Sequence, residues 1–143
     1  PAYAARVHFT ETRPDPTTAD ALSEAAFDIV RTVSAKCIIC FTESGSPARR
    51  IARDRPLVPI LVLTPKLATA RRLGLLWGVH AVSTRDVSSF EEMVAKSKRM
   101  ALRHGIAGGG DRVIMMAGVP FGTPGSTNVL HVVRLTGQEL KGR

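Results

Sequence analysis

A loop of hydroxyl-bearing residues around a glycine is the part of this sequence best suited to chemistry. It follows the apolar run 36–41 and contains, in order, Thr42, Glu43, Ser44, Gly45 and Ser46. Ser46 suits the N-cap of a helix, and Pro47 suits its first position, where the fixed φ of proline is already helical. A strand, such a loop and a helix N-terminus together hold a phosphate with backbone N–H groups and the helix dipole. The alternative is an ordinary strand-to-helix turn.

The cysteines and histidines of the chain predict less chemistry. Cys37 and Cys40 form a C-x-x-C pair inside the apolar run, where their odd separation places them on opposite faces of a strand. No second pair of ligands at suitable spacing completes a zinc site, so we expect buried structural thiols. The four histidines are scattered and have no paired nucleophile: His8, His80, His104 and His131.

Composition limits the class of protein. The formal net charge of +8, from 20 Lys and Arg against 12 Asp and Glu, favours anionic partners such as phosphorylated metabolites or nucleic acids. The basic residues are spread among acidic ones and no nucleic-acid-binding motif accompanies them, so solvated helix faces are the preferred interpretation. No apolar run approaches the ~20 residues that span a bilayer, and the first residues lack the apolar stretch of a secretion signal. We expect a cytoplasmic protein.

Apolar runs and helical periodicity alternate along the chain. After a lead-in segment at 1–16, the sequence predicts one domain over 17–143. Helices are predicted at 17–35, 47–54, 65–73 and 88–104, and strands at 36–41, 59–63, 79–82, 112–117 and 128–135. Thr64-Pro65 repeats the cap-and-proline pattern, and Ser88 with Glu91 matches a capping box. The alternation predicts a three-layer α/β/α domain with a mainly parallel five-stranded sheet, its last strand antiparallel.

A second loop, at 118–127, follows the fourth predicted strand. Ligands of open parallel sheets bind beyond the carboxyl ends of the strands, where the strand order reverses. In common orders such as 2-1-3-4-5, the loops 42–46 and 118–127 face each other at that end. The second loop offers backbone N–H and hydroxyl groups from Gly122, Thr123, Gly125, Ser126 and Thr127. Two such walls favour a pocket for a phosphate-bearing ligand.

Several ordered segments resemble the C-terminal domain of pyruvate kinase. They are Phe41-Thr-Glu-Ser-Gly-x-x-Ala-Arg-Arg, Arg55-Pro-x-x-Pro-Ile-Leu-x-Leu-Thr-Pro, Arg71-Arg-Leu-x-Leu-x-Trp77-Gly-Val79, Gly-Asp111-x-Val-Ile and Gly125-Ser-Thr-Asn128. The match runs in order from about Thr18 to Leu135, which is nearly the whole chain. In pyruvate kinases, a (β/α)8 barrel transfers a phosphoryl group from phosphoenolpyruvate to ADP with Mg²⁺ and often K⁺. The C-terminal domain binds an allosteric effector and joins subunits into a tetramer.

The resemblance implies a regulatory domain rather than an enzyme. The chain has no room for the barrel, so we expect no catalysis, metal or cofactor in it. The implied partners are a phosphorylated effector (a sugar phosphate or a nucleotide), the barrel domain and further copies of the chain. The implied effector residues are Thr42, Ser44, Gly45 and Ser46 with Arg49 behind them, and Gly122, Thr123, Gly125, Ser126 and Thr127.

Three departures from the family pattern bear on that site. Glu43 stands where some sugar-phosphate-regulated members carry Lys, and Phe121 brings no positive charge to the second loop. Pro47 replaces the usual Ser or Thr, which removes a hydroxyl and an N–H donor. A lost charge-assisted hydrogen bond costs about 1.5–3 kcal/mol. Arg49 or Arg50 is the cation available to compensate.

Three hypotheses follow from the sequence. The first is an allosteric and assembly domain of pyruvate kinase, and the second is an assembly domain without a ligand. The third is a basic module for nucleic acid or an acidic partner. The apolar strand at 128–135 suits either a subunit contact or a covered sheet edge. We expect the domain to self-associate at least weakly.

Overall fold

The computed structural model describes residues 17–121 and 127–141. The helices are α2 (Thr18–Val33), α3 (Ser46–Arg53), α4 (Leu67–Leu73) and α5 (Phe90–Arg103), and the strands are β1 (Ile38–Phe41), β2 (Ile60–Thr64), β3 (Val79–Ser83), β4 (Arg112–Ala117) and β5 (Val129–Arg134). Each of these elements was predicted, with ends that differ by one or two residues. Within the described ranges, no helix has both the length and the hydropathy needed to cross a membrane.

The five strands form one sheet in the order β3-β2-β1-β4-β5. The first four strands are parallel, and β5 pairs with β4 in the antiparallel direction, which confirms the predicted sheet. The order differs from the 2-1-3-4-5 arrangement taken as the example above, but it also contains one reversal. The chain moves outward from β1 to β3 and then returns to the other side of β1, so the reversal lies between β1 and β4. The loops that follow these two strands therefore flank the switch point.

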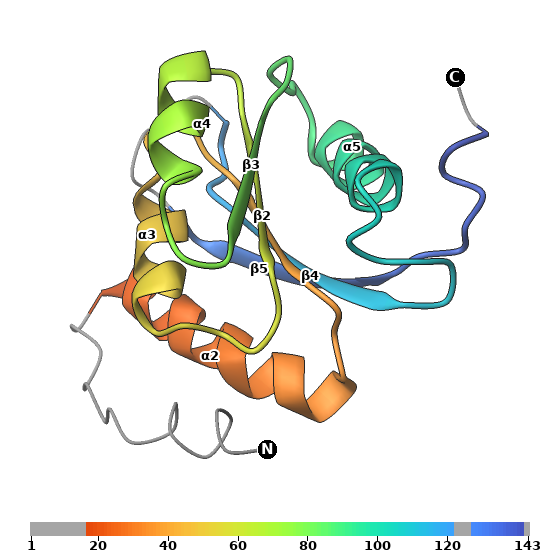
Figure 1. Ribbon diagram of the computed structural model, residues 1–143, viewed down its shortest axis with the longest axis horizontal. Coiled ribbons are helices and arrows are strands. Elements are labelled where there is room, and N and C mark those ends of the chain that lie inside the picture. The colour runs from red at the N-terminus through yellow and green to blue at the C-terminus, as the bar shows by residue number, and fades with distance from the viewer. Residues whose placement is uncertain (1–16, 122–126, 142–143) are drawn as a thin grey trace.

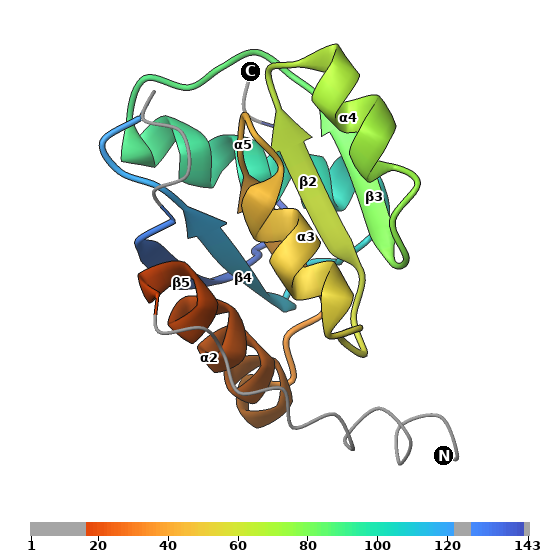
Figure 2. The same ribbon diagram turned by 90° about the vertical axis from the view of Figure 1, so that its left-hand side faces the viewer.

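Helices cover both faces of the sheet, as the buried runs of the strands require. Figure 1 shows α2, α3 and α4 on one side of the sheet and α5 on the other. Figure 2, turned by 90°, shows α3 in front of the strands and α5 behind them. The residues of β1 and Cys37 just before it alternate between the two cores: Ile38 and Cys40 pack with α2 and α3, whereas Cys37 and Ile39 pack with α5. The three-layer architecture is confirmed.

Three predicted helix starts are wrong by one or two residues. Ser46 is the first helical residue and Gly45 is the N-cap, because the positive φ of Gly45 (83°) turns the chain into the helix. Thr64 remains in β2, where it continues the parallel ladder opposite Ser83, so α4 begins only at Leu67.

The third correction concerns α5. Its N-cap is Ser89, whose side chain accepts from the Glu92 backbone N–H, rather than Ser88 with Glu91. The Glu92 carboxylate accepts from the Ser88 backbone N–H at 2.9 Å and from its hydroxyl at 3.0 Å. These bonds lower the pKa of Glu92. The N-cap is therefore one residue later than predicted, and the return bond from Glu92 goes to Ser88, the residue before the N-cap, rather than to the N-cap itself as in a capping box.

Candidate functional site

Thr42 closes the loop that follows β1. Its backbone N–H donates to the Leu63 carbonyl at 3.0 Å, which ties the start of the loop to β2. Its hydroxyl accepts from the Gly45 backbone N–H, also at 3.0 Å. The side chain is buried, with 9% of Thr42 exposed. Thr42 therefore stabilises the conformation of the loop through these two hydrogen bonds and is not itself open to solvent.

Gly45 is required by both its conformation and its packing. Its φ of +83° lies in the left-handed region that L side chains rarely adopt. A Cβ at this position would lie 2.9 Å from Cδ2 of Leu73, a buried residue of α4. The glycine thus allows the loop to approach α4 closely, which places the start of α3 beside α4.

Ser44 and Ser46 present their hydroxyls at the start of α3. The Ser46 backbone N–H donates to the Ser44 oxygen Oγ at 3.3 Å, and the two hydroxyls are also 3.3 Å apart. Both residues are half-buried. Because the amides of Gly45 and Ser46 already have partners within the loop and Pro47 has none to offer, an anion here would meet hydroxyl groups first.

The negative charge of Glu43 is offset by Lys66, a contact that was not predicted from the sequence. Its carboxylate oxygen Oε2 lies 3.2 Å from Nζ of Lys66, just before α4. The Thr69 hydroxyl of α4 also donates to the Glu43 carbonyl at 2.9 Å. The negative charge beside the loop therefore has a cation next to it, which reduces the electrostatic penalty for an anion.

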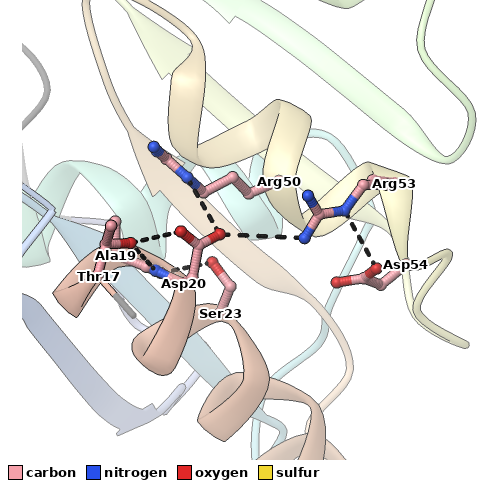
Figure 3. A network of polar contacts seen from close by, with 7 residues as sticks. All are labelled: Thr17, Ala19, Asp20, Ser23, Arg50, Arg53 and Asp54. Carbon is pink, nitrogen blue, oxygen red and sulfur yellow. Dashed lines mark hydrogen bonds and ion pairs between the residues drawn. The ribbon is translucent and has the colours of Figure 1, made fainter. Parts of the chain in front are cut away.

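The two arginines that follow the loop have separate environments. Arg50 directs its Nε toward Oδ1 of Asp20 on α2, at 3.4 Å, and Arg53 approaches the same oxygen at 3.9 Å (Figure 3). Asp20 is 5% exposed and also accepts from the Thr17 hydroxyl. Arg50 is therefore engaged with α2, whereas Arg49 is exposed.

The second predicted loop can be placed only at its ends. Gly122, Thr123, Gly125 and Ser126 lie outside the described residues, whereas Thr127 is buried at the start of the return to β5. Asn128 holds the two ends of the loop together: its amide Nδ2 donates to the Val119 carbonyl at 2.6 Å, and its Oδ1 accepts from the Val119 N–H at 2.9 Å.

The role of Asn128 was missed from the sequence, where it appeared only as the end of a family motif. An amide side chain at the start of a strand that returns from a long loop is the signal that could have revealed it. The Asn128 amide forms both a donor and an acceptor bond with the Val119 backbone, as a paired residue of a neighbouring strand would. It therefore fixes where the loop leaves and rejoins the sheet.

The cysteines are inert, as predicted. Cys37 and Cys40 are both free and buried, and they belong to the cores on opposite faces of the sheet. Burial raises the pKa of each thiol to about 12. Because the two thiols lie on opposite faces of the sheet, they cannot form a disulfide with each other or bind one zinc ion together.

Comparison with known proteins agrees with the fold and with the order of the motifs. The family described as "Pyruvate kinase, alpha/beta domain" matches residues 20–133, which is most of the chain. This chain belongs to that family. It is the C-terminal α/β domain of a pyruvate kinase, as the resemblance of the ordered segments implied.

Three similar pyruvate kinases illustrate the relationship. The chain is 46% identical to a pyruvate kinase of Methylorubrum extorquens over 123 residues, which cover 86% of this chain and 26% of that protein. It is 42% identical to one of Agrobacterium vitis over 80% of the chain and 24% of the relative. It is 33% identical to that of Geobacillus stearothermophilus over 89% and 22%. The chain thus spans about a quarter of the length of the pyruvate kinases it matches.

Proposed function

We propose that this domain binds a phosphorylated effector, a sugar phosphate or a nucleotide, between the loops that follow β1 and β4. The observation that supports this most directly is the strand order, because both loops leave the sheet on either side of the reversal between β1 and β4. A ligand held there would contact two segments that are distant in the sequence. In the full-length enzyme, it would then regulate phosphoryl transfer in the barrel domain.

The local chemistry of the β1 loop supports an anionic ligand. Ser44 and Ser46 offer hydroxyl donors at the N-terminus of an eight-residue helix. Arg49 is exposed one turn behind them, and Lys66 offsets the charge of Glu43. Because two loop amides are used internally and Pro47 lacks an N–H, binding depends on the hydroxyls, the second loop and Arg49.

The test is calorimetric titration of the full 143-residue chain with a hexose monophosphate, a hexose bisphosphate and AMP. We expect one of them to bind with a stoichiometry of one. Ser44→Ala should weaken binding by about ten- to a hundredfold, the loss expected for one hydrogen bond to a charged group. Binding by none of the three, or equal binding by the Ser44→Ala variant, would contradict the proposal.

A matched control separates loss of the ligand from loss of the fold. Thr32→Ala removes an exposed hydroxyl from the last turn of α2, where it donates to the Asp28 carbonyl. It should leave effector affinity unchanged. Gly45 is unsuitable as a binding probe, because its substitution would disturb packing against Leu73 as well as the loop.

We also propose that β5 contributes to assembly of the enzyme. It is the outermost strand on its side of the sheet, so its outer edge has backbone groups that the described sheet leaves unpaired. Its side chains include Val132, which is 36% exposed. Light scattering should detect dimers at high protein concentration, and Val132→Lys should lower their fraction. A constant monomer mass at all concentrations would contradict this part of the proposal.

A further inference from the structure

We propose that His80 and His104 form a binding site for a divalent transition-metal ion. The site lies near the start of the edge strand β3, away from the loops that follow β1 and β4. The Nε2 atom of His80 lies 3.2 Å from Nδ1 of His104, and the ring centroids are 4.9 Å apart with an interplanar angle of 58°. The two residues are 24 positions apart in the sequence, so only the fold brings them together.

The topology explains why these two side chains meet. Val79 and Ala81 of β3 face the core beneath α4, so the alternation of the strand directs His80 to the side covered by α5. The chain reaches α5 from the carboxyl end of β3 and returns across the sheet, so the C-terminus of α5 lies over the beginning of β3. His104 is the C-cap of that helix.

Rigid backbone supports both rings. His80 lies in the parallel ladder opposite Leu61 of β2. The His104 backbone N–H donates to the Met100 carbonyl at 3.0 Å, and Gly105 follows with a φ of +64° that ends the helix. Because both side chains are exposed, the imidazoles can turn toward a common ion while their backbones stay fixed.

The separation of the two nitrogens suits two ligands of one metal ion. Nitrogens about 2.1 Å from zinc are about 3.0 Å apart at a right angle and about 3.4 Å apart at the tetrahedral angle. The observed 3.2 Å lies between these values. The C-terminal end of α5 also carries the negative end of the helix dipole, which favours a cation.

Charge and ligand number set the expected strength of the site. The described residues contain no group of three or more metal-ligating side chains, so water would complete the coordination shell. Arg103, the last residue of α5, is the neighbouring cation and opposes binding. The affinity of nitrogen ligands for divalent ions of this series is highest for Cu²⁺, which binds more tightly than Ni²⁺ or Zn²⁺.

The experiment is calorimetric titration of the full chain with CuCl2 and ZnCl2 at pH 7.5, after removal of metals with a chelator. We expect one equivalent to bind, with Cu²⁺ tighter than Zn²⁺. His80→Ala and His104→Ala should each weaken binding at least about tenfold, because each removes one of two protein ligands. The control His131→Ala removes a histidine that packs against Phe90 elsewhere and should bind as the unmodified chain does.

A spectroscopic measurement covers the case in which other histidines also bind metal. The Cu²⁺ complex should show paramagnetic-resonance splittings from two imidazole nitrogens, and His104→Ala should reduce them to one. Failure of the chain to bind Cu²⁺ would overturn the proposal. Equal affinities for the unmodified, His80→Ala and His104→Ala chains would overturn it too, and would leave the pair as a hydrogen bond only.

Discussion

The turn after β1 and the turn after β2 both join a buried threonine to a proline and a helix, yet their geometries differ. Thr42 accepts from the Gly45 N–H at 3.0 Å, and Thr64 accepts from the Lys66 N–H at 3.3 Å. Only the first turn has a glycine in the left-handed region. It is also the turn that opens beside the reversal of strand order, whereas the second lies between two parallel neighbours on the same side.

A threonine followed by a proline and a helix is therefore not sufficient to form a loop with the hydroxyl groups and the glycine that suit a bound anion. In the first turn, Gly45 lets the chain pack against Leu73, and the loop brings the hydroxyls of Ser44 and Ser46 together at the helix start. In the second turn, the chain passes from Thr64 through Pro65 and Lys66 directly to α4, with no glycine and no further hydroxyl before the helix. We therefore expect substitutions at these contacts to affect the two turns to different extents.

Gly45→Ala should have the largest effect on stability. It combines a positive φ, which costs a non-glycine residue about 1–2 kcal/mol, with overpacking against Leu73, which costs about 1–3 kcal/mol. We expect the free energy of unfolding to fall by about 2–4 kcal/mol in urea denaturation. Gly78→Ala is the matched control, because Gly78 has a φ of +70° and open space around its Cβ position. Equal losses in both variants would show that packing on Leu73 is unimportant.

Asp20→Ala should have the next largest effect. The first turn leads into a helix that is held to α2 through the buried carboxylate of Asp20, which faces Arg50 and Arg53, whereas the ion pair at the start of α4 joins two partly exposed side chains, Lys66 and Glu43. The buried carboxylate would be lost, but both arginines are partly exposed and can rehydrate, so we expect a loss of about 1–2 kcal/mol in urea denaturation. Asp28→Ala removes an exposed carboxylate of α2 and should change stability by less than about 0.5 kcal/mol. A comparable loss in the two variants would contradict this interpretation of Figure 3.

Thr42→Val and Thr64→Val compare the two threonine hydroxyls directly. Each substitution keeps the shape of a buried side chain and leaves one backbone N–H without its acceptor. Because the Thr42 bond is shorter and closes a buried loop, we expect its loss to cost about 1–2 kcal/mol, against about 0.5–1 kcal/mol for Thr64. The unfolding free energies of the two variants provide the measurement. A larger loss for Thr64→Val would reverse the ranking of the turns.

Lys66→Ala should have the smallest effect on stability. The Lys66 and Glu43 side chains are 60% and 31% exposed, and ion pairs of this kind contribute about 0–1 kcal/mol. Its larger effect should be on the ligand, because Glu43 would then face a bound phosphate without a cation beside it. We expect weaker effector binding in Lys66→Ala and recovery in the double variant Glu43→Gln, Lys66→Ala. An effector affinity that is unchanged in both variants would show that the phosphate binds away from Glu43 and Lys66.

Much of this fold could be predicted from the sequence because it depends on patterns within short segments. The buried runs specify the strands, the odd spacing of Cys37 and Cys40 separates their faces, and the long last connection permits the antiparallel strand. The helix starts were less accurate. Ser88 and Ser89 suit an N-cap equally well, and the conformation of Gly45 depends on Leu73, which is distant in the sequence.

The position of the loop after β1 was predictable from the sequence, but the contacts of its residues were not. Thr42, Ser44 and Gly45 lie where the strand order indicates. The partners Lys66 for Glu43, Asp20 for Arg50 and Val119 for Asn128 come from segments that meet only in three dimensions. Local sequence patterns contain no information on contacts between distant segments. The ion pairs of Glu43 with Lys66 and of Arg50 with Asp20 therefore could not be inferred from the sequence.

The most direct test of the central claim is an amide chemical-shift titration of the labelled chain with the effector that binds in calorimetry. We expect the largest shifts at Ser44, Gly45 and Ser46 and in the loop 118–127, with little change at His80 and His104, which lie at the edge strand β3 and the end of α5. Shifts confined to residues away from the carboxyl ends of β1 and β4 would contradict it.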